Sequence, residues 1–520
     1  MNKERKSRAF NPRYESPGQM VLPGFESPFS KTLNPNNRWV VLAKLIPWDE
    51  ICSPLLHRVG NSAAGRKPLN PRIVLGSLII KYILNLDDRE TVSQISENMY
   101  MQYFLGYSSF IDEEPFDASL FVDFRKALGI ETINTINEKI VQLKTRFEAK
   151  DREKVKAKSP CEPSGLPTID SPLEKPQEES VTHKGKVLFD ATACPQDIAY
   201  PTDLNLLSDA REKAEELIDS IYNKELHGGK PRTYRREARK YYLQTAQKKN
   251  KTKKVIRKAI GKQLRYLKRD IGILHHLLDA YGRLPFDRYQ LKYFYVIQTL
   301  YDQQKEMYDN KVHSVPYRIV SIHQPHVRPI VRGKEQAKVE FGSKIHVSVI
   351  DGISFVDQLS WEAFNEGSGL QSYVEDFRRR FGYYPREVLA DKIYCTRENR
   401  AWLKGKGIVL RAKPLGRPSA VSIHVSPGER NPIEGKFGQG KTAYGLNRIK
   451  ARLKETSESW IAGIFLVLNL VKLAEVALPC LILTRMQNLT AWCLRMIWME
   501  KSEYQTFFGY RKTVRCVAGT

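Results

Sequence analysis

The sequence predicts an α/β fold, preceded by a separate all-α N-terminal domain and interrupted by a second helical region. Between residues 38 and 149, apolar residues recur at the three- and four-residue spacings of helices. Farther along, the spacing changes to two, as in Lys344–Ile350, which is typical of strands. Residues 150–184 are rich in Pro, Ser, Glu and Lys with almost no large apolar side chains, so we expect a disordered linker there.

Composition restricts the possible partners and compartments. The 520 residues include 84 Lys and Arg against 58 Asp and Glu, a net charge of +26 that favours nucleic acid as the partner over a merely solvated basic surface. The seven cysteines are scattered with no C-x-x-C pair, which argues against disulfides and zinc sites and for a reducing compartment. The longest apolar run, Trp460–Val471, is interrupted by Asn469 and predicts a core helix, not a membrane span. The first residues lack the apolar core of a signal peptide, so we expect a cytoplasmic protein with no membrane partner.

The N-terminal third divides into two parts. Residues 1–37 are polar and rich in Pro and Asn, and we expect them to be disordered. Residues 38–149 contain several short helical patterns that suit either a helix-turn-helix-like DNA reader or a dimerisation bundle. The sequence leaves both interpretations open.

Residues 205–312 form the second helical region, which is strongly basic and has tyrosines among its cations. Arg236, Lys253 and Lys254 are candidate contacts to the DNA backbone, because Lys and Arg neutralise phosphates. The alternative interpretation is an ordinary solvated helical face.

Two apolar runs end in an aspartate. Lys186–Asp190 and Glu387–Asp391 each read as a buried strand followed by an acid, and the carboxyl ends of such strands are where α/β sites are built. Alternatively, Asp190 only caps the following turn. Asp351 precedes Gly352 between two strand patterns, so we assign it to a hairpin turn and not to catalysis. Arg318–His323 also alternates as a strand would.

A third acid, Glu434, opens a predicted helix in a basic stretch. Arg430 lies four positions before it, and Lys441, seven positions after it, would share its face of the helix. One alternative is a capping box with Asn431 as the N-cap. Another is a P-loop, since residues 435–442 match G-x4-G-K-[ST]; the preceding prolines and charges make a poor buried strand, and no Walker B follows.

Asp190, Asp391 and Glu434, if they meet at one sheet edge, can hold two Mg²⁺ ions, with Mn²⁺ as a possible substitute. One ion would activate a water or a 3′-hydroxyl, and the other would stabilise the leaving oxygen.

At this point the motifs resemble a known family. Arg430, Glu434 and Lys441 fit the last three positions of the signature Tyr-x2-Arg-x3-Glu-x6-Lys, although Pro427 stands at the Tyr position. Residues 188–203 and 388–394 look like the first and second Asp blocks of the same family. The chain therefore resembles the bacterial insertion-sequence DDE transposases over roughly residues 38–473.

The resemblance implies an RNase H-like mixed sheet in residues 185–473, with residues 205–312 as a helical insertion. It implies that Asp190, Asp391 and Glu434 form the catalytic, metal-binding triad, and that Arg430 and Lys441 contact DNA. The expected activity is Mg²⁺-dependent cleavage at element ends followed by strand transfer of the 3′-hydroxyl into target DNA. We expect a homodimer on DNA in a bacterial cytoplasm, associated with the nucleoid.

Two other functions stay open. The first is a non-catalytic DNA-binding protein derived from a transposase, and the second is a P-loop ATPase acting on nucleic acid. Residues 474–520 match no motif, and the sequence predicts no role for them.

Overall fold

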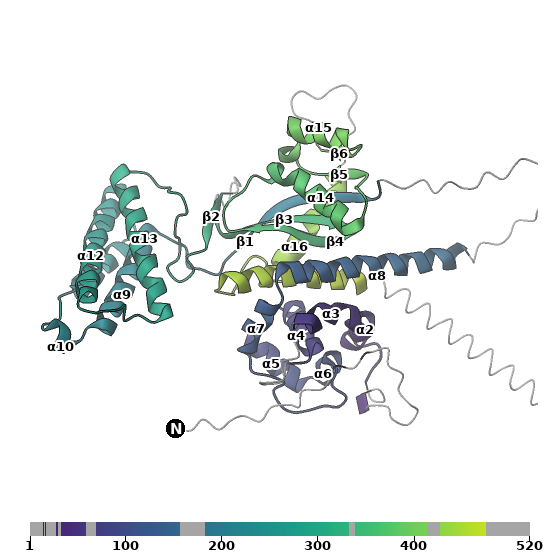
Figure 1. Cartoon of the computed structure of the whole chain (residues 1–520), viewed down its shortest axis with the longest axis horizontal. Coiled ribbons are helices and arrows are strands. Elements are labelled where there is room, and N and C mark those ends of the chain that lie inside the picture. The colour runs from purple at the N-terminus through teal and green to yellow at the C-terminus, as the bar shows by residue number, and fades with distance from the viewer. Residues whose placement is uncertain are drawn as a thin grey trace, which may run out of the picture.

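The computed structural model describes residues 14, 16, 28–29, 33–58, 69–156, 183–331, 339–412 and 427–474. Most of the predicted N-terminal disordered segment, residues 157–182 of the predicted linker and residues 475–520 of the tail lie outside these ranges. Figure 1 shows three parts: a central sheet with its helices, an N-terminal group of helices below it, and a helical bundle to one side.

The central sheet is mixed. Its strands are β1 (Lys186–Pro195), β2 (Arg328–Val331), β3 (Val339–Ile350), β4 (Ile353–Ser360), β5 (Glu387–Leu389) and β6 (Val409–Arg411). The order is β2-β3-β1-β5-β6, and β4 also pairs with β3. Strand β3 is antiparallel to β1, β2 and β4, whereas β1, β5 and β6 run parallel. The parallel half of the sheet is the half that places the two aspartates of interest.

Two loop predictions have opposite outcomes. The Asp351–Gly352 hairpin is confirmed: both residues have positive φ, 48° and 81°, as a tight two-residue turn between β3 and β4 requires. The strand predicted at residues 318–323 is wrong, because these residues form bends. Their apolar spacing has another cause, since Ile319 and Ile322 pack into the side bundle while Val320 packs into a small cluster with Trp361.

The N-terminal part is all helical, as predicted. Its helices are α2 (Arg38–Leu45), α3 (Trp48–Arg58), α4 (Pro71–Leu84), α5 (Asp88–Glu97), α6 (Met99–Leu105), α7 (Leu120–Ala127) and α8 (Ile130–Lys156). The N-cap side chains of Asn37, Asn70, Asp87 and Asn98 accept backbone N–H groups at four of the helix starts. Helix α8 continues to Lys156, so residues 150–156, which we predicted as linker, are helical.

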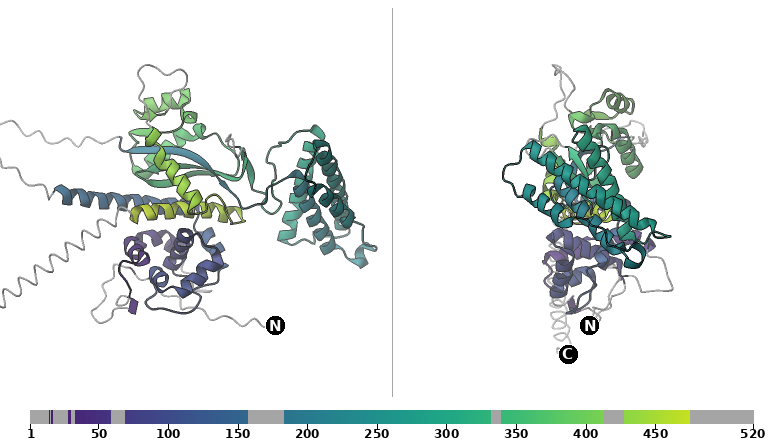
Figure 2. Two further views of the ribbon diagram at one scale, coloured as in Figure 1. Left: turned by 180° about the vertical axis from the view of Figure 1, so that it is seen from behind. Right: turned by 90° about the vertical axis from the view of Figure 1, so that its left-hand side faces the viewer.

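The N-terminal helices do not form a separate unit, because they share one hydrophobic core with the sheet. The ring of Tyr82 packs edge-on against Trp460 at 5.7 Å. The Asn134 side chain, on α8, donates a hydrogen bond to the carbonyl oxygen of Val356 on β4 at 2.9 Å. In Figures 1 and 2, α8 and the last described helix run between the sheet and the other N-terminal helices.

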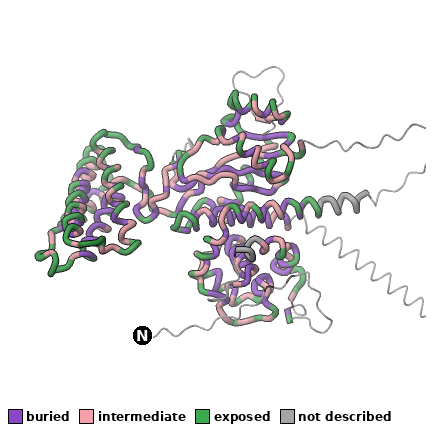
Figure 3. Tube along the Cα trace, in the orientation of Figure 1, coloured by how far each residue is buried: buried purple, intermediate pink, exposed green. Residues whose placement is uncertain are grey.

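That last helix, Lys454–Ala474, is the one segment of the described chain long and apolar enough to cross a membrane. Its most apolar window is 78% buried inside the protein, which fits the predicted core helix. Figure 3 shows buried positions along the sheet and the helices beneath it, whereas the outer faces of the side bundle are exposed.

The side bundle lies between β1 and β2 in the sequence. It contains α9 (Asp203–Ile221), α10 (Lys224–His227), α11 (Arg235–Ala246), α12 (Lys253–Asp279) and α13 (Arg288–Asn310). Leucines and isoleucines of α9, α12 and α13 form a second hydrophobic core of its own. The turned view in Figure 2 shows the bundle beside the sheet, joined to it by connecting segments.

The remaining elements surround the parallel strands. They are η1 (Glu366–Gly369), α14 (Leu370–Phe381), η2 (Lys392–Tyr394), α15 (Arg397–Gly405), η3 (Pro427–Glu429) and α16 (Asn431–Thr442). Of these, η2 and α16 carry the residues on which the candidate site depends.

Candidate active site

The register of two parallel strands brings Asp190 and Asp391 side by side. Leu188 on β1 pairs with Leu389 on β5, and each aspartate lies two residues beyond its paired leucine. Since neighbouring strands are about 4.8 Å apart, the two carboxylates start from adjacent positions. One detail differs from the prediction: β1 does not end at Asp190 but continues to Pro195, because β3 pairs with it along that whole length.

Arg430 joins the two aspartates. Its guanidinium lies 3.5 Å from an oxygen of Asp190 and 3.2 Å from an oxygen of Asp391. The residue is the N-cap of α16, directly after Glu429, which forms an ion pair with Arg411 on β6 at 3.5 Å. This pairing fixes the start of α16 over the ends of the parallel strands.

Each aspartate side chain accepts a hydrogen bond from the backbone amide of the residue that follows it. The amide of Ala191 donates to Asp190 at 2.8 Å, and the amide of Lys392 donates to Asp391 at 2.7 Å. Burial raises the pKa of Asp190, and the nearby acids Glu366 and Asp391 raise it further, while the Ala191 amide and Arg430 oppose the rise. The charged form of Asp190 therefore depends on a cation close by.

Glu434 lies on α16, one turn after Arg430, and its side chain is exposed. The helix is anchored by a buried stripe of Ile433, Phe437 and Gly440. Among the described residues, no three acidic, His or Cys side chains are grouped so as to hold a metal ion, so Glu434 does not form one cluster with the two aspartates. The structure thus brings two of the three predicted acids together and carries the third on the helix that supplies their shared cation.

Two alternative interpretations of this helix are wrong. Asn431 is its first residue and not its N-cap, and no side chain caps the helix start, so there is no capping box. The P-loop match at residues 435–442 lies entirely within α16. A P-loop needs these glycines in an open turn whose amides face phosphate, and helical amides are already hydrogen-bonded to the preceding turn.

The donor set fits a divalent cation. Carboxylate oxygens are the ligands that Mg²⁺ prefers, and a guanidinium already bridges Asp190 and Asp391, so this pair attracts positive charge. A metal ion and Arg430 would compete for the same oxygens. Among the residues that the structure describes, no group of three His, Cys, Asp or Glu side chains is close enough to hold a metal ion.

Glu366 is an acid of this neighbourhood that the sequence did not reveal. It belongs to η1, is bound by Lys344 of β3 at 2.8 Å, and raises the pKa of Asp190. Its sequence context, a short loop ahead of a helix, carries no signal of this position. Only the packing of η1 against η2, the element that follows Asp391, places it there.

The predicted DNA-binding cations occupy two regions. Lys441 lies on α16, about three turns after Arg430 and on the same side of the helix. Arg236 on α11 and Lys253 and Lys254 at the start of α12 are exposed residues of the side bundle. Figure 1 shows the bundle as a separate lobe beside the sheet that carries Asp190.

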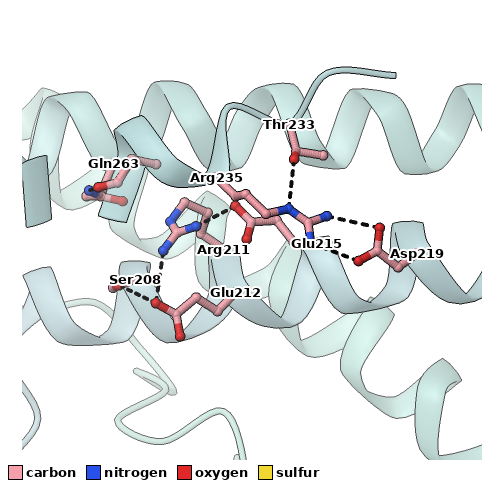
Figure 4. A network of polar contacts seen from close by, with 9 residues as sticks. Ser208, Arg211, Glu212, Glu215, Asp219, Thr233, Arg235 and Gln263 are labelled. Carbon is pink, nitrogen blue, oxygen red and sulfur yellow. Dashed lines mark hydrogen bonds and ion pairs between the residues drawn. The ribbon is translucent and has the colours of Figure 1, made fainter. Parts of the chain in front are cut away.

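A second cluster of charged side chains lies inside the bundle, as Figure 4 shows. Arg211 is buried and forms ion pairs with Glu215 and, at 3.0 Å, with Glu212. Arg235 makes two hydrogen bonds of 2.9 Å to Asp219. These residues pair with one another and face one another, so we assign them to the architecture of the bundle.

Comparison with known proteins adds two domain assignments. Residues 27–127 match the transposase domain family DUF772, and residues 388–471 match the transposase DDE domain family. The second match includes Asp391, Arg430, Glu434 and Lys441. A 185-residue segment, 35% of this chain, is 28% identical to the uncharacterized protein ORF8 in the nfe locus of Rhizobium meliloti and covers 73% of that protein. No solved structure matches the chain.

Proposed function

Because its two matched regions support an insertion-sequence DDE transposase, we propose that this chain binds the ends of such an element, cleaves them and joins the freed 3′-hydroxyl to target DNA. The observation that carries the proposal is the pair of aspartates on adjacent parallel strands, bridged by one arginine. A DDE domain implies an RNase H-like fold, and the mixed sheet, antiparallel on one side of β1 and parallel on the other, supports it.

In this proposal Asp190, Asp391 and Glu434 hold two Mg²⁺ ions, for which Mn²⁺ can substitute. The bound metal would supply the activation of water or a 3′-hydroxyl and the stabilisation of the leaving oxygen. Arg430 opposes the rise in the pKa of Asp190 that burial causes, because an adjacent cation favours the carboxylate over the acid, and the same guanidinium lies beside Asp391. Glu434 would complete the site from α16, the helix whose N-cap is Arg430.

The basic side chains hold DNA around this centre. Arg430 and Lys441 lie on one side of α16 and are proposed to contact the phosphates near the cleaved bond. Arg236, Lys253 and Lys254 are proposed to contact the backbone farther away. Both lysines stand at the positive end of the 27-residue helix α12, where a cation is unfavourable unless an anion approaches it. We propose a homodimer on DNA, acting in the bacterial cytoplasm at the nucleoid and not at a membrane.

A second candidate is a non-catalytic DNA-binding protein derived from a transposase. It is favoured by the exposed position of Glu434 and by the guanidinium between the aspartates, both of which differ from an assembled metal centre.

Strand cleavage with single variants separates these two functions. Asp190→Asn, Asp391→Asn and Glu434→Gln should each lower Mg²⁺-dependent cleavage of DNA carrying the element's terminal repeats by about two orders of magnitude or more. Each should bind the same DNA as wild type does in a gel-shift assay, because the amide keeps the size of the side chain.

Glu398→Gln is the matched control, since Glu398 is an exposed acid on α15 whose carboxylate accepts a hydrogen bond from Gln371. It should cleave normally. Cleavage that survives in all three site variants, or is absent in wild type with Mg²⁺ and with Mn²⁺, would support the non-catalytic function.

A further inference from the structure

A large open groove separates the side bundle from the sheet domain, and the catalytic proposal does not use it. Its volume is about 1490 Å³. It is lined by the connection from β1 to α9, by α13, by residues 320–324 and by the residues around the start of helix Lys454–Ala474. Its walls therefore come from the side bundle and from segments that connect the bundle to the sheet domain.

Three tyrosines of the groove expose most of their surface. Tyr200 is 74% exposed, Tyr289 58% and Tyr295 56%. Each of these rings is held by an edge-on neighbour: Tyr200 by Phe341 at 5.5 Å, Tyr289 by Tyr293 at 4.8 Å and Tyr295 by Phe294 at 5.6 Å. A fixed aromatic ring with an open face is a stacking platform that loses little conformational entropy when a flat partner binds.

The same walls are positively charged. The groove is lined by five cations, which come from α7, α13 and the chain around residue 453: Lys126, Arg288, Lys292, Arg452 and Lys454. Its acids are fewer and partly neutralised. Asp197 is paired with Arg448 at 2.9 Å, and burial raises the pKa of Asp209, which favours its uncharged form; Glu455 is exposed.

Strand β1 connects the candidate active site to the groove. Asp190 lies within this strand, and seven residues later Asp197 lines the groove. An extended chain of seven residues spans at most about 25 Å. At 3.4 Å per base step, that distance corresponds to about seven nucleotides of a DNA strand.

We propose that this groove binds an unpaired stretch of a DNA strand, with bases stacked on Tyr200, Tyr289 and Tyr295 and phosphates on the surrounding cations. The inference rests on the proposed function only in taking DNA as the substrate. Paired DNA does not explain the tyrosines, because the flat faces of its bases are covered by their neighbours in the duplex. Cations alone would suffice for contact with a duplex backbone.

Binding of a single strand by the full chain tests the proposal. Fluorescence anisotropy would be recorded with labelled oligothymidylate of about 12 nucleotides and with a duplex of equal length, in EDTA so that no cleavage occurs. Tyr200→Ala combined with Tyr295→Ala should weaken single-strand binding at least about fivefold for each lost ring, and duplex binding by less than about twofold. The matching double Phe variant should bind as wild type does, because it keeps the rings.

Tyr317→Ala is the control, since Tyr317 is 68% exposed but lies outside the groove lining, and it should change neither affinity. Circular dichroism would confirm that each variant is folded. The proposal is overturned if the double Ala variant binds the single strand as wild type does, if duplex and single strand weaken equally, or if Tyr317→Ala has the same effect.

The two proposals can fail separately. Asp190→Asn should bind oligothymidylate as tightly as wild type does, because Asp190 does not line the groove. If Asp190→Asn loses cleavage but the tyrosine variants bind the single strand as wild type does, the active-site proposal is supported and the groove proposal is rejected. If the double Ala variant binds the single strand more weakly but wild type never cleaves DNA, the groove proposal is supported and the catalytic proposal is rejected.

Discussion

At the scale of single residues, the side bundle contains one acid whose pKa is raised, Asp270, and one whose pKa is lowered, Asp219. Asp270 on α12 is fully buried, and both its carboxyl oxygens lack a hydrogen-bond partner among the residues described. Burial, with a smaller contribution from Glu215, raises the pKa of Asp270 to about 8. Asp219, by contrast, is bound by Arg235 and Lys230, and these bonds lower its pKa. Figure 4 shows Asp219 at the edge of this network.

Because the pKa of Asp270 is raised in the fold, we expect its contribution to make the bundle less stable at neutral than at acidic pH. The folded state keeps its proton up to about pH 8, whereas the unfolded chain loses it near the ordinary value of 3.8. Because the folded state binds more protons between these values, this group lowers the free energy of unfolding by up to about 1.4 kcal/mol for each pH unit in that window. Asp270→Asn should raise the melting temperature at pH 7 and flatten its decline between pH 4 and pH 8.

Asp219→Asn is the control of opposite sign. The pKa of Asp219 is lowered in the fold, so its stabilising contribution is present above the unfolded value and is lost as the pH falls. This variant should lower the melting temperature at pH 7. A decline with pH that is equally steep in wild type and Asp270→Asn would contradict the assignment.

At the scale of elements, the pairing of β1 with β3 depends on a glycine. A side-chain carbon on Gly342 would lie 2.1 Å from the carbonyl oxygen of Cys194 on β1, well inside any permitted contact. Gly342→Ala must therefore separate the strands at the end of β1 that leads into the groove. We expect a loss of about 1–3 kcal/mol in stability, measured as a lower melting temperature.

Gly272→Ala on α12 is the matched control, because nothing lies within 4 Å of the added carbon. Alanine there should leave the stability unchanged or raise it by up to about 1 kcal/mol, since it favours the helix. Equal destabilisation by the two variants would mean that the close approach of β1 and β3 is not the cause.

At the scale of the whole molecule, the two hydrophobic cores predict which parts of the chain can fold when they are produced alone. The side bundle buries its leucines and isoleucines within α9, α12 and α13, so residues 202–324 should fold when produced alone. We expect a helical circular dichroism spectrum and cooperative unfolding in urea.

The N-terminal helices should behave differently. Their core continues into helix Lys454–Ala474, where Tyr82 packs against Trp460, so residues 33–156 alone would expose a large apolar surface. Strong binding of a hydrophobic dye and non-cooperative melting are expected for this fragment. A fragment 33–156 that melts cooperatively, beside a fragment 202–324 that does not, would reverse this picture.

Much of the local structure was predictable from the sequence because its causes are local. The Asp351–Gly352 turn follows from two residues that tolerate positive φ, and α16 from a helical spacing that also sets Arg430, Glu434 and Lys441 on one side. The strand predicted at residues 318–323 failed for a related reason. Alternating apolar residues show that a segment is partly buried, but not that a neighbouring strand is present to pair with, and here the apolar residues pack into two separate clusters.

By itself, the sequence determined the motifs, the basic character and the order of helical and sheet regions, since each depends on residue types at short spacing. The tertiary structure alone decided which acids meet. Asp190 and Asp391 lie about 200 positions apart and become neighbours only through the register of β1 and β5, while Arg430 and Glu366 arrive from two further elements. The core that the N-terminal helices share with the sheet, and the groove, could not be predicted from the sequence either. Both are formed by residues that lie far apart in the chain and meet only when it folds.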